Sequence, residues 1–322
     1  MGKLQVKLSQ MKKYMKLVGN VVSALSILFV LYVLVRTDFH FSNVFSWRNF
    51  LLACFFGIVI KTVTVFLSGS AWAAWLSFFA SKRCSRKEAL RVYAKANLGK
   101  YMPGNVMHYV ERNLFAGKLA MSQKKVAASS ICEVATLVFT AFLMGIVFAC
   151  PAIKNVVARQ AVLKKGLMFG CVVVGILILA VMVFVSFNRN KYGQERPFVW
   201  EKCEKCKPFV QTMLRCMLLY VAVLTGLGII FVLLYCYQGG QLSLGQAFSM
   251  IASYTAAWAV GFVVPGAPGG IGVRELALIT LLENSIGTDV VVTLGVWHRL
   301  ITVIGDLTAY VVAIWIGKSR GL

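Results

Sequence analysis

The sequence predicts an all-α polytopic membrane protein with about six full transmembrane helices and two re-entrant helical hairpins in an inverted repeat. Its 322 residues are 59% hydrophobic and only 14% charged, with a mean hydropathy of +0.77. Several apolar runs reach the ~20 residues that a helix needs to cross a bilayer. Two of these runs are interrupted by proline and glycine. We therefore expect a single integral membrane domain over residues 1–322.

The expected full spans are six apolar segments. They lie at 17–35, 50–80, 126–150, 167–187, 213–237 and 290–316. Five lysines precede the first span, and no small-residue cleavage pattern follows it, so this span is expected to be retained as an anchor rather than removed as a signal peptide. The internal halves would cover 17–187 and 213–316, joined by a charged linker at 188–210.

The basic residues predict the orientation of the chain in the membrane. The net charge is +23, from 34 basic and 11 acidic residues, and lysine and arginine concentrate in cytoplasmic loops and near anionic headgroups. Both termini are basic, and so are the loops at 81–87 and 118–125 and the linker. We expect all of these in the cytoplasm of a multi-pass cell-membrane protein. The loop at 151–166 is also basic, and its side stays open.

Composition argues against two other classes of site. A nucleic-acid binder would need a soluble basic module, and the sequence has none. The nine cysteines are mostly scattered through the spans, and Cys203 and Cys206 are the one patterned pair. A zinc site would need two more ligands at similar spacing. We expect a reduced pair in a cytosolic loop, with no metal and no cofactor.

The second interruption is the stretch V-V-P-G-A-P-G-G-I-G-V-R-E at 263–275, within a broken element at 245–283. Proline and glycine cannot continue a helix there. Broken backbone at membrane depth is tolerated only where protein or water supplies hydrogen-bond partners. The returning helix can begin only at about Val273, and its N-terminus is then suited to an anion.

The first interruption, at Pro103 and Gly104, lies within a broken element at 89–117. Pro103 precedes Arg112 by nine positions, and Pro265 precedes Arg274 by nine positions. Matching breaks in two halves of a membrane protein point to a binding site between internal repeats. The charge pattern has the two elements enter from opposite sides. The candidate hinge residues are Pro103, Gly104, Pro265, Gly266, Pro268, Gly269, Gly270 and Gly272.

Charged and polar residues inside apolar sequence are the candidate binding residues. They are Lys61, His108, Glu111, Arg112, Glu133, Arg274, Glu275, Arg299 and Asp306. Arg274 either holds a phosphate together with the helix N-terminus, or locks the fold by pairing with a glutamate. Arg112 either stays deep or snorkels to the interface, and Lys61 either faces the interior or snorkels near a boundary.

Glu133 and Arg299 lie near the middle of their spans, and Asp306 follows Arg299 by seven residues, two turns along the same face. We expect these three to face a cavity between the hairpins, with Glu133 paired with Arg299. The alternative is a buried structural network without a transport role. Trp297 and the adjacent His298 are interpreted first as aromatic-belt residues. The same interpretation applies to Trp47, Trp72, Trp75 and Trp200.

The segment N-L-G-K-Y-M-P-G at 97–104, followed by Arg112, Glu133 and P-G-G-I-G-V-R-E at 268–275, resembles the lysylphosphatidylglycerol synthase transmembrane family. This is the flippase-like part of the multiple peptide resistance factor. The resemblance covers nearly the whole chain. It implies a bacterial or archaeal cytoplasmic-membrane protein that moves a lipid between leaflets, without the C-terminal synthase domain. Where many members have Gly-Glu, this sequence has Met107 and His108, which bears on headgroup preference.

The leading hypothesis is a flippase or transporter for an anionic or phosphate-bearing lipid. The lipid would be derived from phosphatidylglycerol (lysyl-phosphatidylglycerol is one candidate) or linked to a polyprenyl chain, and Arg112 and Arg274 would bind its phosphate from opposite sides. The alternative is a phosphatidylglycerol lysyltransferase, or a membrane subunit of one. A third hypothesis is a scaffold for a separately encoded synthase or glycosyltransferase. Membrane lipids are the expected partners in each case, and homo-oligomers are compatible with all three.

Overall fold

The computed structural model describes residues 47–80, 85–101, 107–115, 121–148, 206–263, 270 and 272–318. Within these ranges every regular element is a helix. The elements are α2 (Trp47–Phe79), α3 (Arg86–Asn97), the 3₁₀ helix η1 (Leu98–Tyr101), α4 (Met107–Leu114), α5 (Gln123–Phe148), α8 (Cys206–Tyr237), α9 (Leu244–Val263), α10 (Val273–Ile286) and α11 (Thr288–Lys318). The expected spans at 17–35 and 167–187 lie outside the described residues.

Four helices, α2, α5, α8 and α11, are long and apolar enough to cross a membrane. They match the spans expected at 50–80, 126–150, 213–237 and 290–316, so the all-helical class is confirmed and these four segments are candidate membrane spans. The 33 residues of α2 extend about 50 Å, against ~30 Å for the hydrocarbon core, so α2 would tilt or project beyond the bilayer. Helix α8 begins at Cys206, so the last five residues of the expected linker at 188–210 are helical and continuous with the span expected at 213–237.

The two interrupted elements are helix pairs. Helices α3 and α4 pack against each other across one interruption, and α9 packs against α10 across the other. Helix α10 begins at Val273, as expected from the last glycine before it. The hinge candidates Pro103, Gly104, Pro265, Gly266, Pro268 and Gly269 lie outside the described residues, whereas Gly270 and Gly272 lie inside them.

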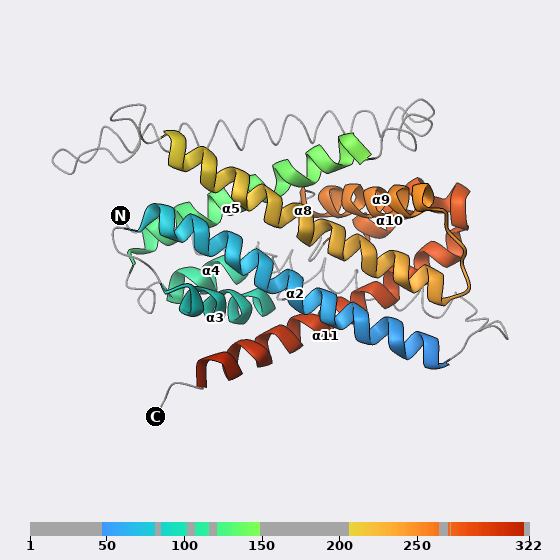
Figure 1. Ribbon diagram of the computed structural model, residues 1–322, viewed down its shortest axis with the longest axis horizontal. Helices are drawn as coiled ribbons and strands as arrows, with labels where there is room; N and C mark the ends of the chain where they lie inside the picture. Colours follow the sequence, from blue (N-terminus) through green and yellow to red (C-terminus); the bar gives the residue numbers. More distant parts are fainter. Residues whose placement is uncertain are drawn as a thin grey trace, which may run out of the picture.

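The described elements follow one order twice: a long helix, a helix pair and a second long helix. Their contacts are reciprocal. The leading helices α2 and α8 pack against each other, α5 packs against α9 of the second pair, and α11 packs against α3 of the first. Figure 1 shows the two pairs toward opposite ends of the long axis, with α2 and α11 crossing between them. Each closing long helix therefore contacts both pairs.

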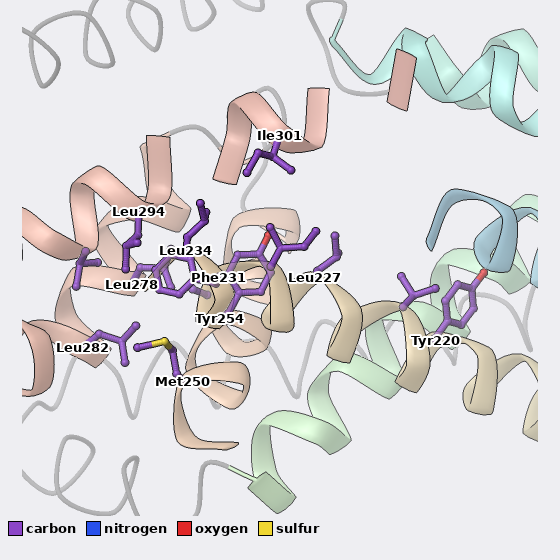
Figure 2. Close-up of a cluster of buried hydrophobic side chains, with 14 of the residues drawn as sticks. Tyr220, Leu227, Phe231, Leu234, Met250, Tyr254, Leu278, Leu282, Leu294 and Ile301 are labelled. Carbon is purple, nitrogen blue, oxygen red and sulfur yellow. The ribbon is translucent and has the colours of Figure 1, made fainter. Parts of the chain in front are cut away.

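The largest apolar core lies where α8, α9, α10 and α11 meet (Figure 2). Phe231 and Leu234 of α8, Tyr254 of α9, Leu278 of α10 and Leu294 of α11 are each at most 1% exposed there. Burying a side chain of this size contributes roughly 1.5–3 kcal/mol relative to leaving it in water. This packing fixes the second helix pair against the long helices that carry the charged residues.

Trp72 and Trp75 are core residues, so their expected place in an aromatic belt is wrong. Both are at most 1% exposed. The Trp72 indole donates to Ser130 Oγ at 3.3 Å and packs against Tyr93. Trp75 packs against Phe209 on the neighbouring long helix α8. Exposed large apolar side chains lie elsewhere, on the outer faces of the long helices. Examples are Leu51, Phe55, Leu218, Val311 and Trp315.

Candidate functional site

Helix α11 holds one helix pair at each of two positions, Arg299 and Asp306. Arg299 Nε lies 2.5 Å from Glu275 Oε1 on α10. Asp306, two helical turns further on, contacts the first helix pair through Asn97, Lys100 and Tyr101. Residues seven apart share a face of a helix, so one face of α11 contacts both pairs.

The tip of the second pair is a close backbone approach that excludes larger residues. Gly270 has φ +72°, and a Cβ there would lie 2.9 Å from the Gly261 carbonyl oxygen of α9. Gly272 has φ +83° and immediately precedes α10. Its N–H donates to Glu275 Oε2 at 2.7 Å. Glu275 thus satisfies a backbone donor at the helix start while its other oxygen accepts from Arg299. Both positions therefore have a backbone conformation that favours glycine, and their role as hinges stays a prediction.

Arg274 lies next to this pair and bonds across the hairpin. Its Nη1 donates to the Tyr254 hydroxyl of α9 at 3.4 Å, and it lies within electrostatic range of both Arg299 and Glu275. The ion pair that the structure shows at Glu275 is with Arg299. The Arg299 Nη2 atom is buried and has no hydrogen-bond partner within the described ranges. We call Arg274, Glu275 and Arg299 the arginine cluster.

His298 and Tyr254 support the arginine cluster from the core. His298 Nε2 lies 3.1 Å from the Leu227 carbonyl oxygen of α8, so that nitrogen carries the proton and donates. His298 Nδ1 then accepts from the Tyr254 hydroxyl at 3.4 Å, and that hydroxyl accepts from Arg274. His298 is 1% exposed, which makes its expected aromatic-belt position wrong. Adjacent residues of α11 thus hold the two arms of the second pair.

Asp306 is the centre of a second cluster. Its carboxylate is fully buried and lies 2.5 Å from Lys100 Nζ and 3.2 Å from Lys61 Nζ. Asn97 Nδ2 donates to it at 2.8 Å, and the Tyr101 hydroxyl also donates to it. Lys61 is 8% exposed, so its side chain faces the interior of the protein. We call Lys61, Lys100 and Asp306 the aspartate cluster.

A glycine on α11, Gly305, leaves space for the Lys61 side chain. A Cβ at Gly305 would lie 2.5 Å from Lys61 Cγ, so only glycine lets α2 approach α11 this closely beside Asp306. Thr62 of α2 also donates to the Gly305 carbonyl oxygen at 3.3 Å. The aspartate cluster therefore joins α2, the first helix pair and α11.

Glu133 of α5 pairs with Arg112 of α4, so the expected pairing of Glu133 with Arg299 is wrong. The Arg112 and Glu133 side chains are 2% and 3% exposed, which removes the snorkelling alternative for Arg112. The guanidinium lies over the ring of Tyr93, 4.1 Å from its centroid, and also faces Trp72 and Tyr109. Such cation–π contacts are strongest where the cation is desolvated. The Arg112–Glu133 ion pair is therefore buried beneath three aromatic rings.

The remaining two candidates lie beside the first pair. His108 is 8% exposed and its ring lies against that of Tyr109 in a tilted contact, with ring centroids 3.8 Å apart. The Glu111 carboxyl carbon would lie 3.3 Å from a Cβ at Gly99, next to Lys100. Glu111 forms no ion pair with any described residue. Neither His108 nor Glu111 joins either cluster.

The two clusters are neighbours. Arg274 lies within electrostatic range of Lys100, and both Arg274 and Arg299 lie within range of Tyr101. Among the residues that the structure describes, the clusters contain four cations and two carboxylates, an excess of two positive charges. An excess of buried positive charge is costly unless an anion accompanies it. The arrangement is chemically suited to bind an anion.

Four residues of this site were not predicted as such: Asn97, Lys100, Tyr101 and Tyr254. The first three lie just before the break at Pro103, and a lysine directly beside a helix interruption was an available signal. Tyr254 lies in uninterrupted apolar sequence, where nothing distinguishes it from a core tyrosine. No protein-family model and no curated protein sequence matches this chain.

Proposed function

We propose that this membrane protein moves an anionic, phosphate-bearing lipid between the leaflets of the cell membrane. The carrying observation is the excess of two positive charges in the aspartate and arginine clusters, located where α11 contacts both broken helix pairs. Phosphate is the common anionic group of membrane lipids, and it would neutralise the positive charge of this site. Arginine binds phosphate with two parallel hydrogen bonds. The motif resemblance described above supports the same class of substrate.

The headgroup phosphate would bind Arg274 and the buried Nη2 of Arg299, which has no hydrogen-bond partner among the described residues, while the acyl chains stay in the bilayer. Glu275 already accepts from both Arg299 and Gly272, so the phosphate competes with a carboxylate for the same arginine. That competition loosens the contact between α10 and α11 when substrate binds. A ligand that binds one of two conformations more tightly than the other shifts the population toward that conformation. Arg112 is left out of the headgroup site, because Glu133 and three aromatic rings already occupy its surroundings.

The broken helix pairs would give access from the two sides in turn. Their placement at opposite ends of the long axis (Figure 1) and the reciprocal contacts of α5 and α11 support an inverted repeat, with each pair entering from one leaflet. In transporters of this kind the site lies near the midplane between the repeats. Arg299 and Asp306, near the middle of α11, fit that depth.

The test is leaflet exchange in reconstituted vesicles. Phosphatidylglycerol with a fluorophore on one acyl chain is quenched by a membrane-impermeant reductant only in the outer leaflet. Wild-type protein should make the inner-leaflet label accessible, and Arg274→Ala should slow this at least about tenfold, because a hydrogen bond to a charged group contributes roughly 1.5–3 kcal/mol. Arg215→Ala on the exposed side of α8 is the matched control and should exchange as wild type does. Equal exchange by all three proteins at equal folding contradicts the proposal.

A further inference from the structure

We propose that the site takes a lipid with two separated phosphate groups, one for each cluster, in preference to a lipid with one phosphate. This inference rests on the proposed lipid translocation and names its substrate class. The chemical class is a headgroup in which a short polar linker joins two phosphodiesters, as in cardiolipin, where one glycerol bridges two phosphatidyl groups. Three observations support this inference: the charge of each cluster, the distance between the clusters, and the position of Tyr101 between them.

Each cluster has one cation more than it has carboxylates. Lys61 and Lys100 share the single carboxylate of Asp306. Arg274 and Arg299 face the single carboxylate of Glu275. One monoanionic headgroup would neutralise one cluster and leave the other with its excess charge. Two phosphodiesters neutralise both, so a headgroup with two charges is favoured over a headgroup with one.

No further charge within apolar sequence alters this count. The stretches at 17–35, 102–106, 167–187, 264–269 and 271 contain no lysine, arginine, histidine, aspartate or glutamate. Arg112 and Glu133 neutralise each other. Glu111 lies beside Gly99, the residue before Lys100, and forms no ion pair with a described residue, so the experiment includes a Glu111 variant.

The spacing of the clusters fits two phosphates on one headgroup and does not fit a pyrophosphate. Arg299 and Asp306 are seven residues apart on α11, which corresponds to about 10 Å along the helix axis. The phosphorus atoms of a pyrophosphate lie far closer than this, so a pyrophosphate would occupy one cluster. A glycerol linker allows the wider separation, and the long side chains of lysine and arginine accommodate the remaining difference.

Tyr101 lies between the two clusters. Its hydroxyl donates to Asp306, yet the residue is 45% exposed and lies within electrostatic range of Arg274 and Arg299. Lys100, beside it, has a side chain that is 25% exposed, and the Arg299 side chain is 21% exposed. One cation of each cluster, Lys100 and Arg299, is therefore reachable, whereas Asp306 is fully buried. A two-phosphate headgroup can contact both without displacing the buried carboxylate.

The experiment measures dissociation constants of short-chain phosphatidylglycerol and short-chain cardiolipin for the detergent-solubilised full chain by titration calorimetry. The ratio of the two constants is compared between wild type and Lys100→Gln. Because the acyl chains are the same for both proteins, a change in this ratio reports on the headgroup. We expect Lys100→Gln to reduce the preference for cardiolipin about tenfold, with the larger loss of affinity falling on cardiolipin and the smaller on phosphatidylglycerol.

Three further variants make the result decisive. Lys100→Arg keeps the charge and should keep the preference. Lys61→Gln should lose the preference as Lys100→Gln does, and it replaces Lys100→Gln if that variant fails to fold. Glu111→Gln should leave the ratio unchanged. The inference is overturned if folded Lys100→Gln or Lys61→Gln retains the wild-type ratio, or if Glu111→Gln shifts it, because a third carboxylate would then belong to the site.

A parallel arm separates this inference from the proposed function. Vesicle exchange of acyl-labelled cardiolipin and phosphatidylglycerol is measured with the wild-type protein. If neither lipid exchanges faster than in empty vesicles, the translocation proposal fails. If both exchange at one rate and Lys100→Gln slows neither, only the two-phosphate inference fails. A short-chain pyrophosphate lipid that binds as tightly as cardiolipin would also overturn it.

Discussion

The two broken helix pairs share one architecture but differ in polarity and in how they are locked. In the first pair, α3 has 12 residues, and its exposed face carries charged residues such as Arg91 and Glu88. In the second, α9 has 20 residues with no charged side chain. Each returning helix is held to the next long helix by one arginine–carboxylate pair. The arginine is on the returning helix in the first pair and on the long helix in the second.

The difference lies in how accessible these two ion pairs are. The Arg112–Glu133 pair is at most 3% exposed and is enclosed by aromatic rings, so it can serve only as a fixed contact. The Arg299 side chain is 21% exposed, and its Nη2 atom has no partner within the described ranges. The Arg112–Glu133 ion pair thus anchors the fold, whereas Arg299 can release Glu275 and bind a ligand instead. Similar sequence spacing does not imply a similar role.

Breaking the enclosed pair should have the largest effect. Arg112→Met leaves Glu133 buried without its cation and should destabilise the protein by about 3–5 kcal/mol. Arg299→Met should cost less than half as much, because Glu275 keeps its bond from Gly272 and gains water. Thermal unfolding in detergent compares the two, with the double variant Arg112→Met and Glu133→Gln expected to recover part of the loss. Equal destabilisation by the two single variants would remove the distinction between the pairs.

Replacing Gly270 with alanine should have the next largest effect. The positive φ and the 2.9 Å approach to the Gly261 carbonyl oxygen make the substitution strained, by about 1–3 kcal/mol. Gly245→Ala is the matched control, because nothing lies within 4 Å of a Cβ at that position, and it should be neutral or slightly stabilising. The readout is the unfolding midpoint. A Gly270→Ala variant as stable as wild type would show that the tip of the second pair is looser than described.

Tyr254→Phe should weaken anion binding without unfolding the protein. The substitution removes the hydroxyl that accepts from Arg274 and donates to His298. Losing a hydrogen bond of this kind corresponds to about 0.5–1.5 kcal/mol, or roughly a 2–10-fold loss of phosphatidylglycerol affinity. Tyr235→Phe on α8 serves as the control for removing a tyrosine hydroxyl elsewhere. Unchanged affinity in Tyr254→Phe would mean that the tyrosine does not position Arg274.

Arg91→Ala in the first pair should have the smallest effect. The Arg91–Glu88 ion pair has side chains 40% and 34% exposed, with 3.3 Å between Nη1 and Oε2. Exposed pairs of this kind contribute at most about 0.5 kcal/mol. The unfolding midpoint should therefore shift by less than in any variant above. A larger shift would place α3 in a much drier environment than its charged face indicates.

The sequence predicts the breaks and the depth of the charged residues because both depend on local chemistry. Proline and glycine end helices wherever they stand, which is why α10 begins at Val273. Apolar context placed Arg299 near mid-depth and Asp306 on the same helix face, and it left Lys61 open between the interior and a boundary. The structure pairs each of the three with an opposite charge.

The partners of these charges could not be predicted in the same way. Hydropathy gives the depth of Glu133 but not the rotation of α5 or the identity of its neighbours, so Arg112 and Arg299 were equally available as partners. For the same reason Trp72 was assigned to a belt when it lies in the core. The contribution of Lys100 and Tyr101 depends on the first pair reaching α11, a contact between residues more than 200 positions apart.

The most direct test of the central account compares exchange rates of two lipids that carry the same acyl fluorophore in the same vesicles. If the excess positive charge of the two clusters selects the substrate, wild-type protein should exchange phosphatidylglycerol at least about tenfold faster than zwitterionic phosphatidylcholine. The double variant Arg274→Gln and Arg299→Gln should then lose this difference. Wild-type exchange at one rate for both lipids, or an unchanged preference in the double variant, would contradict the account.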